Sequence, residues 1–452
     1  MRKRLVAFIL LISIFSLIGC GPSLESEMSV DALLKDGSYE ASAIAHNGPL
    51  TVSVTIKDGD ISDIRVVEHS ESKGIGDIPI KLIPQQIIEN QSLSVDVMTG
   101  ATFTSLGLIN AIEDCIKQAG GNVSDFQKAL AKEKSDEVKQ LETDILVIGA
   151  GTSGLAASLS AADQGVKVIL LEKQSIPGGA GILSTGTVQA SGSKLQKDAG
   201  VEDSAQEYYE DMMELTDGKR QPNLVKLITE KSGETIDWLV EKGVTFRDEV
   251  VRGVGSLGNR QHLASPDASG LISPMFNSIE EDENIDVYLD TTATELIVEN
   301  DRVVGAKAQH RDGKQFEIRA KNVILSVGGF GGNKEMVGKY VGKTGTEMSY
   351  VGARGNTGEL IEAVINLGAD IVDMDKILFS PTTDYERNQL ITAQVLSRGG
   401  FLVNQKGLRF TNETSSPGEY FEDIMATGDD YVLELFDSQV LQHVPHIDRK
   451  SV

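Results

Sequence analysis

The stretch Asp144-Ile-Leu-Val-Ile-Gly149-Ala-Gly151-Thr-Ser-Gly154 decides the fold of this chain. Its apolar run is typical of a buried parallel strand, and the glycines follow it without a gap. The first glycine makes a tight turn, the second lets backbone approach a pyrophosphate, and the third lets a helix pack on the strand. Residues 153–164 then predict that helix, and residues 166–172 predict a second strand that ends in Glu172, whose carboxylate can accept hydrogen bonds from ribose hydroxyls. The stretch therefore predicts a dinucleotide site in a Rossmann-like α/β domain with a parallel sheet.

Composition limits the chemistry that surrounds this site. The chain has 452 residues and a net charge of −25, with 40% apolar and 24% charged residues, so about three domains of roughly 150 residues are expected. The acidic balance argues against nucleic acid as a partner, because a phosphate-binding face needs clustered Lys and Arg. Cys20 and Cys115 are the only cysteines, which excludes a disulfide framework, a Cys-rich zinc site, an iron–sulfur cluster and a c-type haem. Redox chemistry must then use an organic cofactor, and no metal site is predicted.

The first residues have the pattern of a targeting signal. A basic segment, MRKR at residues 1–4, precedes an almost wholly apolar run at residues 5–18. Leu17-Ile-Gly-Cys20 resembles the lipobox of bacterial lipoproteins, and this resemblance implies that residues 1–24 are a lipoprotein signal peptide and lipobox, with lipid on Cys20. An ordinary cleaved secretory signal is the alternative. Polar residues 21–35 would form a tether, so we expect a mature protein that is lipid-anchored to the cell membrane on its extracytoplasmic face.

Residues 36–120 predict a small α+β domain. Alternation in residues 50–56 and 61–67, joined by Asp58-Gly59, predicts an antiparallel meander. Helices are expected at residues 79–90 and 105–118. The apolar residues of the second helix are spaced by three and four, and Cys115 within it is expected to be a buried free thiol: Leu106, Ile109, Ile112 and Ile116.

Between those helices lies Asp96-Val-Met-Thr-Gly-Ala-Thr102-Phe-Thr-Ser105. Gly100 permits a tight turn, and the helix that follows has N–H groups that favour an anion. A hydroxyl here could be an ordinary N-cap or could meet a phosphate. The stretch resembles the (S/T)GAT signature of the FMN-binding domain found in NADH:quinone reductase and electron-transport-complex subunits. That resemblance implies that Thr102 carries covalent FMN through a phosphoester bond, which a dedicated flavin transferase makes.

Residues 121–142 are expected to be a linker. The charged run at residues 128–139 favours an exposed helix or a flexible segment, which marks a domain boundary.

The region after Glu172 resembles the fumarate reductase and succinate dehydrogenase flavoprotein family. Residues 177–186 match its flavin-contacting loop, with Ala180 and Gly181 in place of the usual Asn and Ser or Thr. Residues 320–330 match its returning strand and glycine turn, and residues 355–359 match its GxxGDG element with Glu for Asp. The resemblance implies an FAD-binding domain over residues 143–372. The implied FAD-binding residues are Gly149, Gly151, Gly154, Glu172, Lys173, Gly178, Gly179, Ala180, Gly181, Thr185, Gly186, Ala293, Gly328, Gly329 and Glu359.

Residues 373–452 resemble the entry to that family's capping domain, which holds the substrate, but the catalytic positions differ. The family has His at Ser380 and Met at Leu390, whereas the carboxylate-binding Thr is kept as Thr392. The proton-donating Arg falls on Pro417, which has no ionisable group, and its relay partners fall on Ala393 and Leu396. Thr392 and Ser380 remain as candidates that could hydrogen-bond a substrate carboxylate or carbonyl. A different residue would then protonate the product, and the candidates are Arg398, Tyr385 and His262, whereas Arg409 is expected to be structural.

The chain stops at Val452, soon after residues 431–437, where the family continues. We therefore expect a partial capping domain over residues 373–452 and a truncated gene product.

Two flavin sites and a lipoprotein signal together predict an electron relay. A membrane donor would reduce FMN, FMN would reduce FAD, and FAD would reduce the C=C bond of an unsaturated carboxylate or ketone, as in fumarate and urocanate reductases. Two alternatives stay open. The chain could be a flavin electron carrier without a substrate of its own, or an inactive fragment that folds only over residues 36–120.

Overall fold

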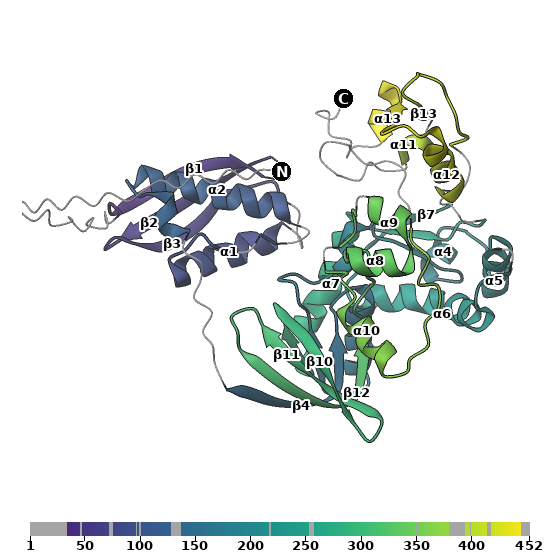
Figure 1. Cartoon of the computed structure of the whole chain (residues 1–452), viewed down its shortest axis with the longest axis horizontal. Coiled ribbons are helices and arrows are strands. Elements are labelled where there is room, and N and C mark those ends of the chain that lie inside the picture. Colours follow the sequence, from purple (N-terminus) through teal and green to yellow (C-terminus); the bar gives the residue numbers. More distant parts are fainter. Residues whose placement is uncertain are drawn as a thin grey trace, which may run out of the picture.

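The structure is a computed structural model that describes residues 34–45, 48–71, 76–95, 97–98, 101–127, 137–216, 218–252, 257–348, 350–353, 355–378, 394–397, 399–413 and 417–443. Three parts follow one another: an N-terminal domain (34–127), a nucleotide domain (137–378) and a C-terminal segment (394–443) (Figure 1). Among the helices in these ranges, none is both long enough and apolar enough to cross a membrane.

The N-terminal domain is a three-stranded antiparallel sheet covered by two helices. Its strands are β1 (Gly37–Ile44), β2 (Pro49–Lys57) and β3 (Asp60–Glu68), in the order β1-β2-β3. Its helices are α1 (Asp77–Asn90), α2 (Thr102–Gln118) and the short 3-10 helix η1 (Val123–Phe126). Asp58 and Gly59 have φ of 57° and 85°, the left-handed conformation that a tight hairpin needs. The predicted meander and both predicted helices are confirmed.

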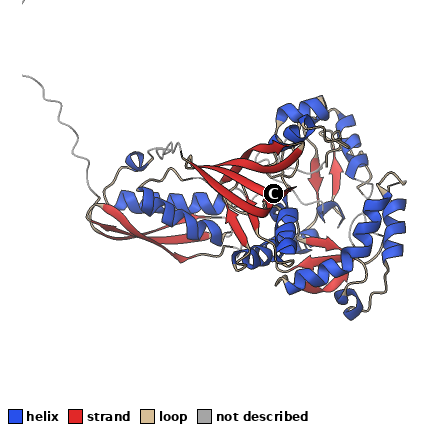
Figure 2. Cartoon of the chain, turned by 90° about the horizontal axis from the view of Figure 1, so that it is seen from below, coloured by secondary structure: helices blue, strands red, loops and turns tan. Residues whose placement is uncertain are grey.

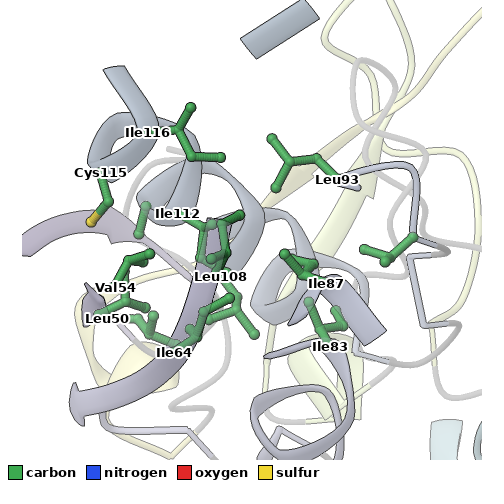
Figure 3. Close-up of a cluster of buried hydrophobic side chains, with 14 of the residues drawn as sticks. Leu50, Val54, Ile64, Ile83, Ile87, Leu93, Leu108, Ile112, Cys115 and Ile116 are labelled. Atoms are coloured by element: carbon green, nitrogen blue, oxygen red, sulfur yellow. The ribbon is translucent and has the colours of Figure 1, made fainter. Parts of the chain in front are cut away.

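One buried cluster joins this sheet to its helices (Figure 3). Alternate residues of β2 point inward, as period-2 patterning requires, and meet α2, whereas α1 lies against β3. The buried side chains from these elements include Leu50, Val54, Ile64, Ile83, Ile87, Leu108, Ile112, Cys115 and Ile116. Cys115 is the predicted buried thiol: it donates a hydrogen bond to the Tyr39 carbonyl at 3.3 Å, and burial raises its pKa to about 11. The expected apolar face of α2 was wrong at Leu106, which is 41% exposed because the buried face instead runs through Leu108 and Ala111.

The nucleotide domain is built on a six-stranded sheet with the order β10-β11-β12-β4-β5-β9. Strands β12, β4, β5 and β9 are parallel, and β10 and β11 extend the sheet as antiparallel hairpins. The bounds are β4 (Val138–Ile148), β5 (Val168–Leu171), β9 (Ile285–Tyr288), β10 (Thr291–Glu299), β11 (Arg302–His310) and β12 (Gln315–Leu325). The predicted α/β class and the returning strand beside β4 are confirmed.

Both faces of this sheet are covered (Figure 2). On β4, Val147 belongs to the cluster under α3 (Thr152–Ala162) and α7 (Ala268–Glu280), whereas Leu146 and Ile148 belong to the cluster on the other face. A strand that is buried on both sides reads as a continuous apolar run, which is the pattern at residues 145–148.

Smaller elements complete the two C-terminal parts. The sheet β6-β8-β7 consists of β6 (Thr187–Gln189), β7 (Phe246–Val251) and β8 (Gln261–Ala264). The remaining helices of the nucleotide domain are η2 (Gly179–Leu183), α4 (Lys194–Asp198), α5 (Ala205–Glu214), α6 (Pro222–Glu241), α8 (Lys334–Tyr340), α9 (Lys343–Glu347) and α10 (Glu359–Asn366). The C-terminal segment contains α11 (Gln394–Ser397), β13 (Phe401–Val403), α12 (Pro417–Thr427), β14 (Leu433–Leu435) and α13 (Ser438–His443).

The expected linker over residues 121–142 is shorter in the structure. Residues 138–142 are the first part of β4 and pair with residues 315–319 of β12. At the other end, the Phe126 carbonyl accepts hydrogen bonds from the Ser92 hydroxyl and the Leu93 N–H, which ties η1 to the N-terminal domain. The charged composition misled the prediction because most of residues 138–142 are exposed while their backbone is paired.

Candidate functional site

A cavity of about 440 Å³ lies at the carboxyl ends of the parallel strands β4 and β5, where nucleotide folds bind their ligands. We call it the nucleotide cavity. Its lining residues come from the glycine turn, the flavin-loop match and three later segments: Ile148, Gly149, Gly151, Thr152, Ser153, Leu171–Gln174, Ile176, Pro177, Gly179–Leu183, Thr291–Ala293, Ser326–Gly329, Ala353, Gly355, Asn356, Glu359 and Leu360.

The three glycines of the turn have the separate tasks that the sequence predicts. A side-chain carbon on Gly149 would lie 2.3 Å from the Ser326 carbonyl oxygen, and one on Gly154 would lie 1.8 Å from the Gly149 carbonyl oxygen. Both positions therefore exclude a side chain so that β4, β12 and α3 can meet closely. A carbon on Gly151 would have nothing within 4 Å, because this residue faces the nucleotide cavity.

Gly151 is also the N-cap of α3, and no side chain caps that helix end. An uncapped helix N-terminus with open space before it suits the pyrophosphate of a dinucleotide. The residues present at this position thus fit FAD.

Glu172 lines the cavity at the end of β5. One carboxylate oxygen accepts a hydrogen bond from the Ala150 N–H and the other from the Gln174 N–H, both at 2.8 Å. These bonds fix the carboxylate beside the glycine turn, and each oxygen keeps a second lone pair for a ribose hydroxyl. Burial raises the pKa of Glu172, against the effect of the two backbone donors.

Lys173 and Glu359 meet at the rim of the same cavity. The Lys173 ammonium donates hydrogen bonds to the Thr357 hydroxyl at 2.5 Å and to Glu359 at 3.0 Å. Thr357 in turn donates to Glu359 at 2.6 Å. Burial alone would raise the pKa of Glu359, but the Thr357 hydroxyl and the Lys173 charge lower it below its ordinary value. Glu at this position, where the related element has Asp, thus stays ionised and paired with Lys173.

The packing of the flavin loop against α3 accounts for glycine at position 181, where the family has a polar residue. A side-chain carbon on Gly181 would lie 2.1 Å from the Thr152 hydroxyl oxygen, so the residue that replaces a polar one is held to glycine by α3. Ala180 lines the cavity beside it. Thr185 and Gly186 lie outside the lining: the Thr185 hydroxyl shares a hydrogen bond with Thr187 at 2.9 Å, and Gly186 packs on the Asp267 backbone.

Eleven of the residues predicted for FAD line the cavity: Gly149, Gly151, Glu172, Lys173, Gly179, Ala180, Gly181, Ala293, Gly328, Gly329 and Glu359. Gly154 and Gly178 shape the turn without lining it. Sequence reasoning missed polar lining residues at Thr152, Ser153, Gln174, Thr291, Thr292 and Asn356. Their places in the sequence could have indicated them. Thr152 and Ser153 directly follow Gly151, Gln174 comes soon after β5, Thr291 and Thr292 directly precede Ala293, and Asn356 lies within the matched element at residues 355–359.

The second site is the start of α2. Thr102 is the first residue of that helix, its N-cap is Ala101, and no side chain caps it. The Ser105 hydroxyl is used in the local turn, since it accepts from the Met98 N–H at 3.2 Å and donates to the Ala101 carbonyl at 2.9 Å. The first turn holds no acidic residue, so the helix end suits the phosphate of FMN.

At this second site, Glu71 is a residue that sequence reasoning missed. It is buried, and its carboxylate accepts a short hydrogen bond from the Thr104 hydroxyl. The bond joins the end of β3 to the first turn of α2, so Glu71 positions the backbone that carries Thr102.

Ser380, Tyr385, Leu390, Thr392, Ala393 and Arg398 lie outside the described residues, as does Cys20 at the other end of the chain. Pro417 is the first residue of α12, and Leu396 is buried. Arg409 pairs with buried Glu413 at 2.5 Å, and Glu413 accepts from the Leu402 N–H, in agreement with a structural role.

His262 was wrong as a candidate proton donor. It is 1% exposed, its Nε2 shares a hydrogen bond with the Ser193 hydroxyl at 2.7 Å, and its Nδ1 lies 2.9 Å from the Arg260 carbonyl oxygen. Burial lowers the pKa of the imidazole, which therefore stays neutral. Both nitrogens are thus engaged by partners inside the protein.

Comparison with known proteins agrees with both sites. Residues 144–444 match the FAD binding domain family, and residues 46–117 match the FMN-binding domain family. Urocanate reductase of Eggerthella lenta is 32% identical over 88% of this chain and 67% of its own length, and NADH:acrylate oxidoreductase of Vibrio harveyi is 32% identical over 86% and 45%. The open conformation of a flavocytochrome c3 fumarate reductase superposes with a TM-score of 0.62 at 28% identity, covering 71% of this chain and 59% of that one.

These findings first define a class: flavoproteins with an FMN-binding and an FAD-binding domain on one polypeptide. The chain belongs to the FAD binding domain family of flavin-dependent oxidoreductases, in the company of fumarate-, urocanate- and acrylate-reducing relatives. It spans 67%, 45% and 44% of the lengths of the first three curated relatives that it matches.

Proposed function

We propose that this protein reduces the C=C bond of a small unsaturated carboxylate or ketone with electrons that a membrane donor supplies through covalent FMN on Thr102 to FAD. The observation that carries the proposal is the presence of two separate sites on one chain, each built on an uncapped helix start. The names of the relatives support the substrate class, since they act on urocanate, acrylate and fumarate.

The chain's own residues would divide the work as follows. The α3 N-terminus and Gly151 would hold the pyrophosphate of FAD, and Glu172 would hold a ribose. Apolar Ile148 and Ile182, which are buried, would keep water from the cavity wall. When bound, FAD supplies hydride transfer to an electron-poor C=C bond, and the protein supplies position and electrostatics.

We place the protein on the extracytoplasmic face of the cell membrane, anchored through lipid on Cys20. Covalent attachment of FMN suits this location, because a flavin outside the cell would otherwise be lost, and a flavin transferase is then a required partner for maturation. Labelling cells with radioactive palmitate tests the anchor: label on the protein that Cys20→Ser removes is expected, and unlabelled protein would overturn it.

The reductase proposal is tested with the purified full chain, matured with flavin transferase and supplied with FAD. We expect one acid-stable and one acid-extractable flavin for each chain. After anaerobic reduction, urocanate, fumarate or acrylate should reoxidise both flavins at least as fast as ferricyanide does. The proposal fails if none of these acids reoxidises either flavin.

A second candidate is an electron carrier without its own substrate. Pro417 favours it, because proline at the position of the family's proton donor can neither give nor accept a proton. In that case artificial acceptors alone should reoxidise the two flavins.

A further inference from the structure

The buried cluster of the N-terminal domain does not end at that domain. Two isoleucines of the nucleotide domain, Ile176 and Ile182, belong to it and are 4% and 9% exposed. Both residues also line the nucleotide cavity. They therefore have one side toward the cavity and another against the neighbouring domain.

The N-terminal side of this shared cluster comes from the strands and helices of that domain, and it includes two residues close in sequence to Thr102. Met98 and Ala101 are buried members of the cluster, and Ala101 is the N-cap of α2. Two views agree in placing the N-terminal domain beside the nucleotide domain (Figures 1 and 2).

Within the nucleotide domain, the loop that carries Ile182 packs against α7. A side-chain carbon on Gly178 would lie 3.1 Å from Ile182 and 3.1 Å from Ile272 of α7, so the loop that carries Ile182 is packed on a rigid helix. Close-packed apolar side chains of this kind have little freedom to move, so the packing on α7 fixes the position of Ile182.

We propose that Ile176 and Ile182 form a docking surface for the N-terminal domain, so that one apolar wall separates the FMN attachment point from the nucleotide cavity. The partner of this surface is the buried cluster of the N-terminal domain in the same chain, to which Met98 and Ala101 belong. The surface would hold the two cofactors next to each other, and this role rests on the proposed function. The contact between the two domains does not depend on that function.

The test compares Ile176→Asp with Ile44→Asp in the full-length protein. Ile44 is a matched control because it is 71% exposed on β1 of the N-terminal domain. A carboxylate at position 176 would be buried in apolar contact, so we expect the docked fraction to fall by about tenfold or more. Small-angle X-ray scattering should then give a larger radius of gyration for Ile176→Asp and an unchanged one for Ile44→Asp.

Electron transfer supplies the second measurement. In reduced protein mixed with an enoate or ferricyanide, the phase in which FMN gives its two electrons to FAD should slow by about tenfold in Ile176→Asp. Flavin content is measured in each variant so that loss of a cofactor is not mistaken for slow transfer. Ile176→Ala, which keeps the site apolar, should fold and show a smaller change in the same direction.

The outcomes separate the two ideas. An Ile176→Asp protein whose scattering profile and transfer rate equal those of Ile44→Asp would overturn the docking surface. A compact wild type that expands in Ile176→Asp but shows no transfer between flavins would support docking and contradict the proposed relay.

Discussion

The N-terminal domain and the C-terminal segment differ in how they treat their buried groups. In the N-terminal domain, Thr104 donates to Glu71 and the Ser105 hydroxyl has a donor and an acceptor. In the C-terminal segment, both carboxylate oxygens of Glu434 are buried without a hydrogen-bond partner, and the buried apolar cluster consists of Val395 and Val440 with Phe436 beside them. The polar groups at the start of α2 are thus paired with one another, although Gln86 Oε1 of α1 is buried without a partner in the same domain. Among the described C-terminal residues, none offers a hydrogen bond to the buried Glu434 carboxylate.

The largest effect on the difference between the two regions is expected from a change at Thr102, the attachment residue of the N-terminal domain. Thr102→Val should abolish the acid-stable flavin entirely, because valine has no hydroxyl to esterify, and in-gel fluorescence after denaturation measures it. The matched control is Thr104→Val two residues on, which removes a donor to Glu71 and should cost about 1–3 kcal/mol of stability with FMN still attached. Flavin that persists in Thr102→Val would show that another residue carries it.

The next largest effect should fall on FAD alone. Gly154→Ala places a carbon 1.8 Å from the Gly149 carbonyl, which pushes α3 off β4. We expect FAD affinity to fall by about tenfold or more with covalent FMN unchanged, as measured by the ratio of acid-extractable to acid-stable flavin. Gly338→Ala is the control, because it is exposed on α8 and meets only a methyl group at 3.3 Å. Equal flavin ratios in the two variants would contradict the close packing.

Glu434 offers a pH-dependent test of the C-terminal segment. Burial raises its pKa to about 7, so the folded state binds a proton that the unfolded state releases near pH 4. Ionisation of this buried carboxyl lowers the free energy of unfolding. The loss is absent below the unfolded pKa and grows with pH until the pH passes 7. Glu434→Leu should therefore raise the free energy of unfolding by about 2 kcal/mol at pH 8 and by much less at pH 4.

The control for this change is Glu422→Leu, at an exposed position of α12 in the same segment. Denaturant unfolding at both pH values measures the difference. A Glu434→Leu protein whose gain does not depend on pH would show that the carboxylate already has a partner.

The smallest effect should come from His262. Its pKa is lowered by burial, so its contribution to stability is complete above the unfolded pKa of about 6.5 and is lost as the pH falls below that value. His262→Gln should flatten the acid side of the stability curve by less than the Glu434 effect. Enzymatic reduction of an enoate should keep its pH profile in this variant, and a profile that moves would return His262 to the list of proton donors.

Sequence reasoning succeeded where backbone geometry forces the residue type. Gly149 and Gly154 must be glycines because carbonyl oxygens lie too close for any side chain, and this constraint is visible in sequence as fixed spacing after an apolar strand. It failed where pairing came from far along the chain. Residues 138–142 look like a polar linker, and only their partner strand, nearly two hundred residues later, makes them β-structure.

The sites divide in the same way. Lining residues at motif positions were predictable, including Ala293 and Glu359 far along the chain. Asn356 and Thr291 lie in the same two segments, at positions whose residue type the motifs do not specify. His262 looked reactive in sequence, because nothing local shows that Ser193 and the Arg260 carbonyl take both of its nitrogens.

The close approach of Gly181 to Thr152 has a consequence for any exchange of this loop with the loop of the related flavoproteins. If only residue 181 were replaced by the polar residue of the related proteins, its Cβ atom would lie 2.1 Å from the Thr152 hydroxyl oxygen and would collide with it. The two positions are therefore linked, because a side chain at position 181 requires the Thr152 hydroxyl to rotate away or residue 152 to become smaller.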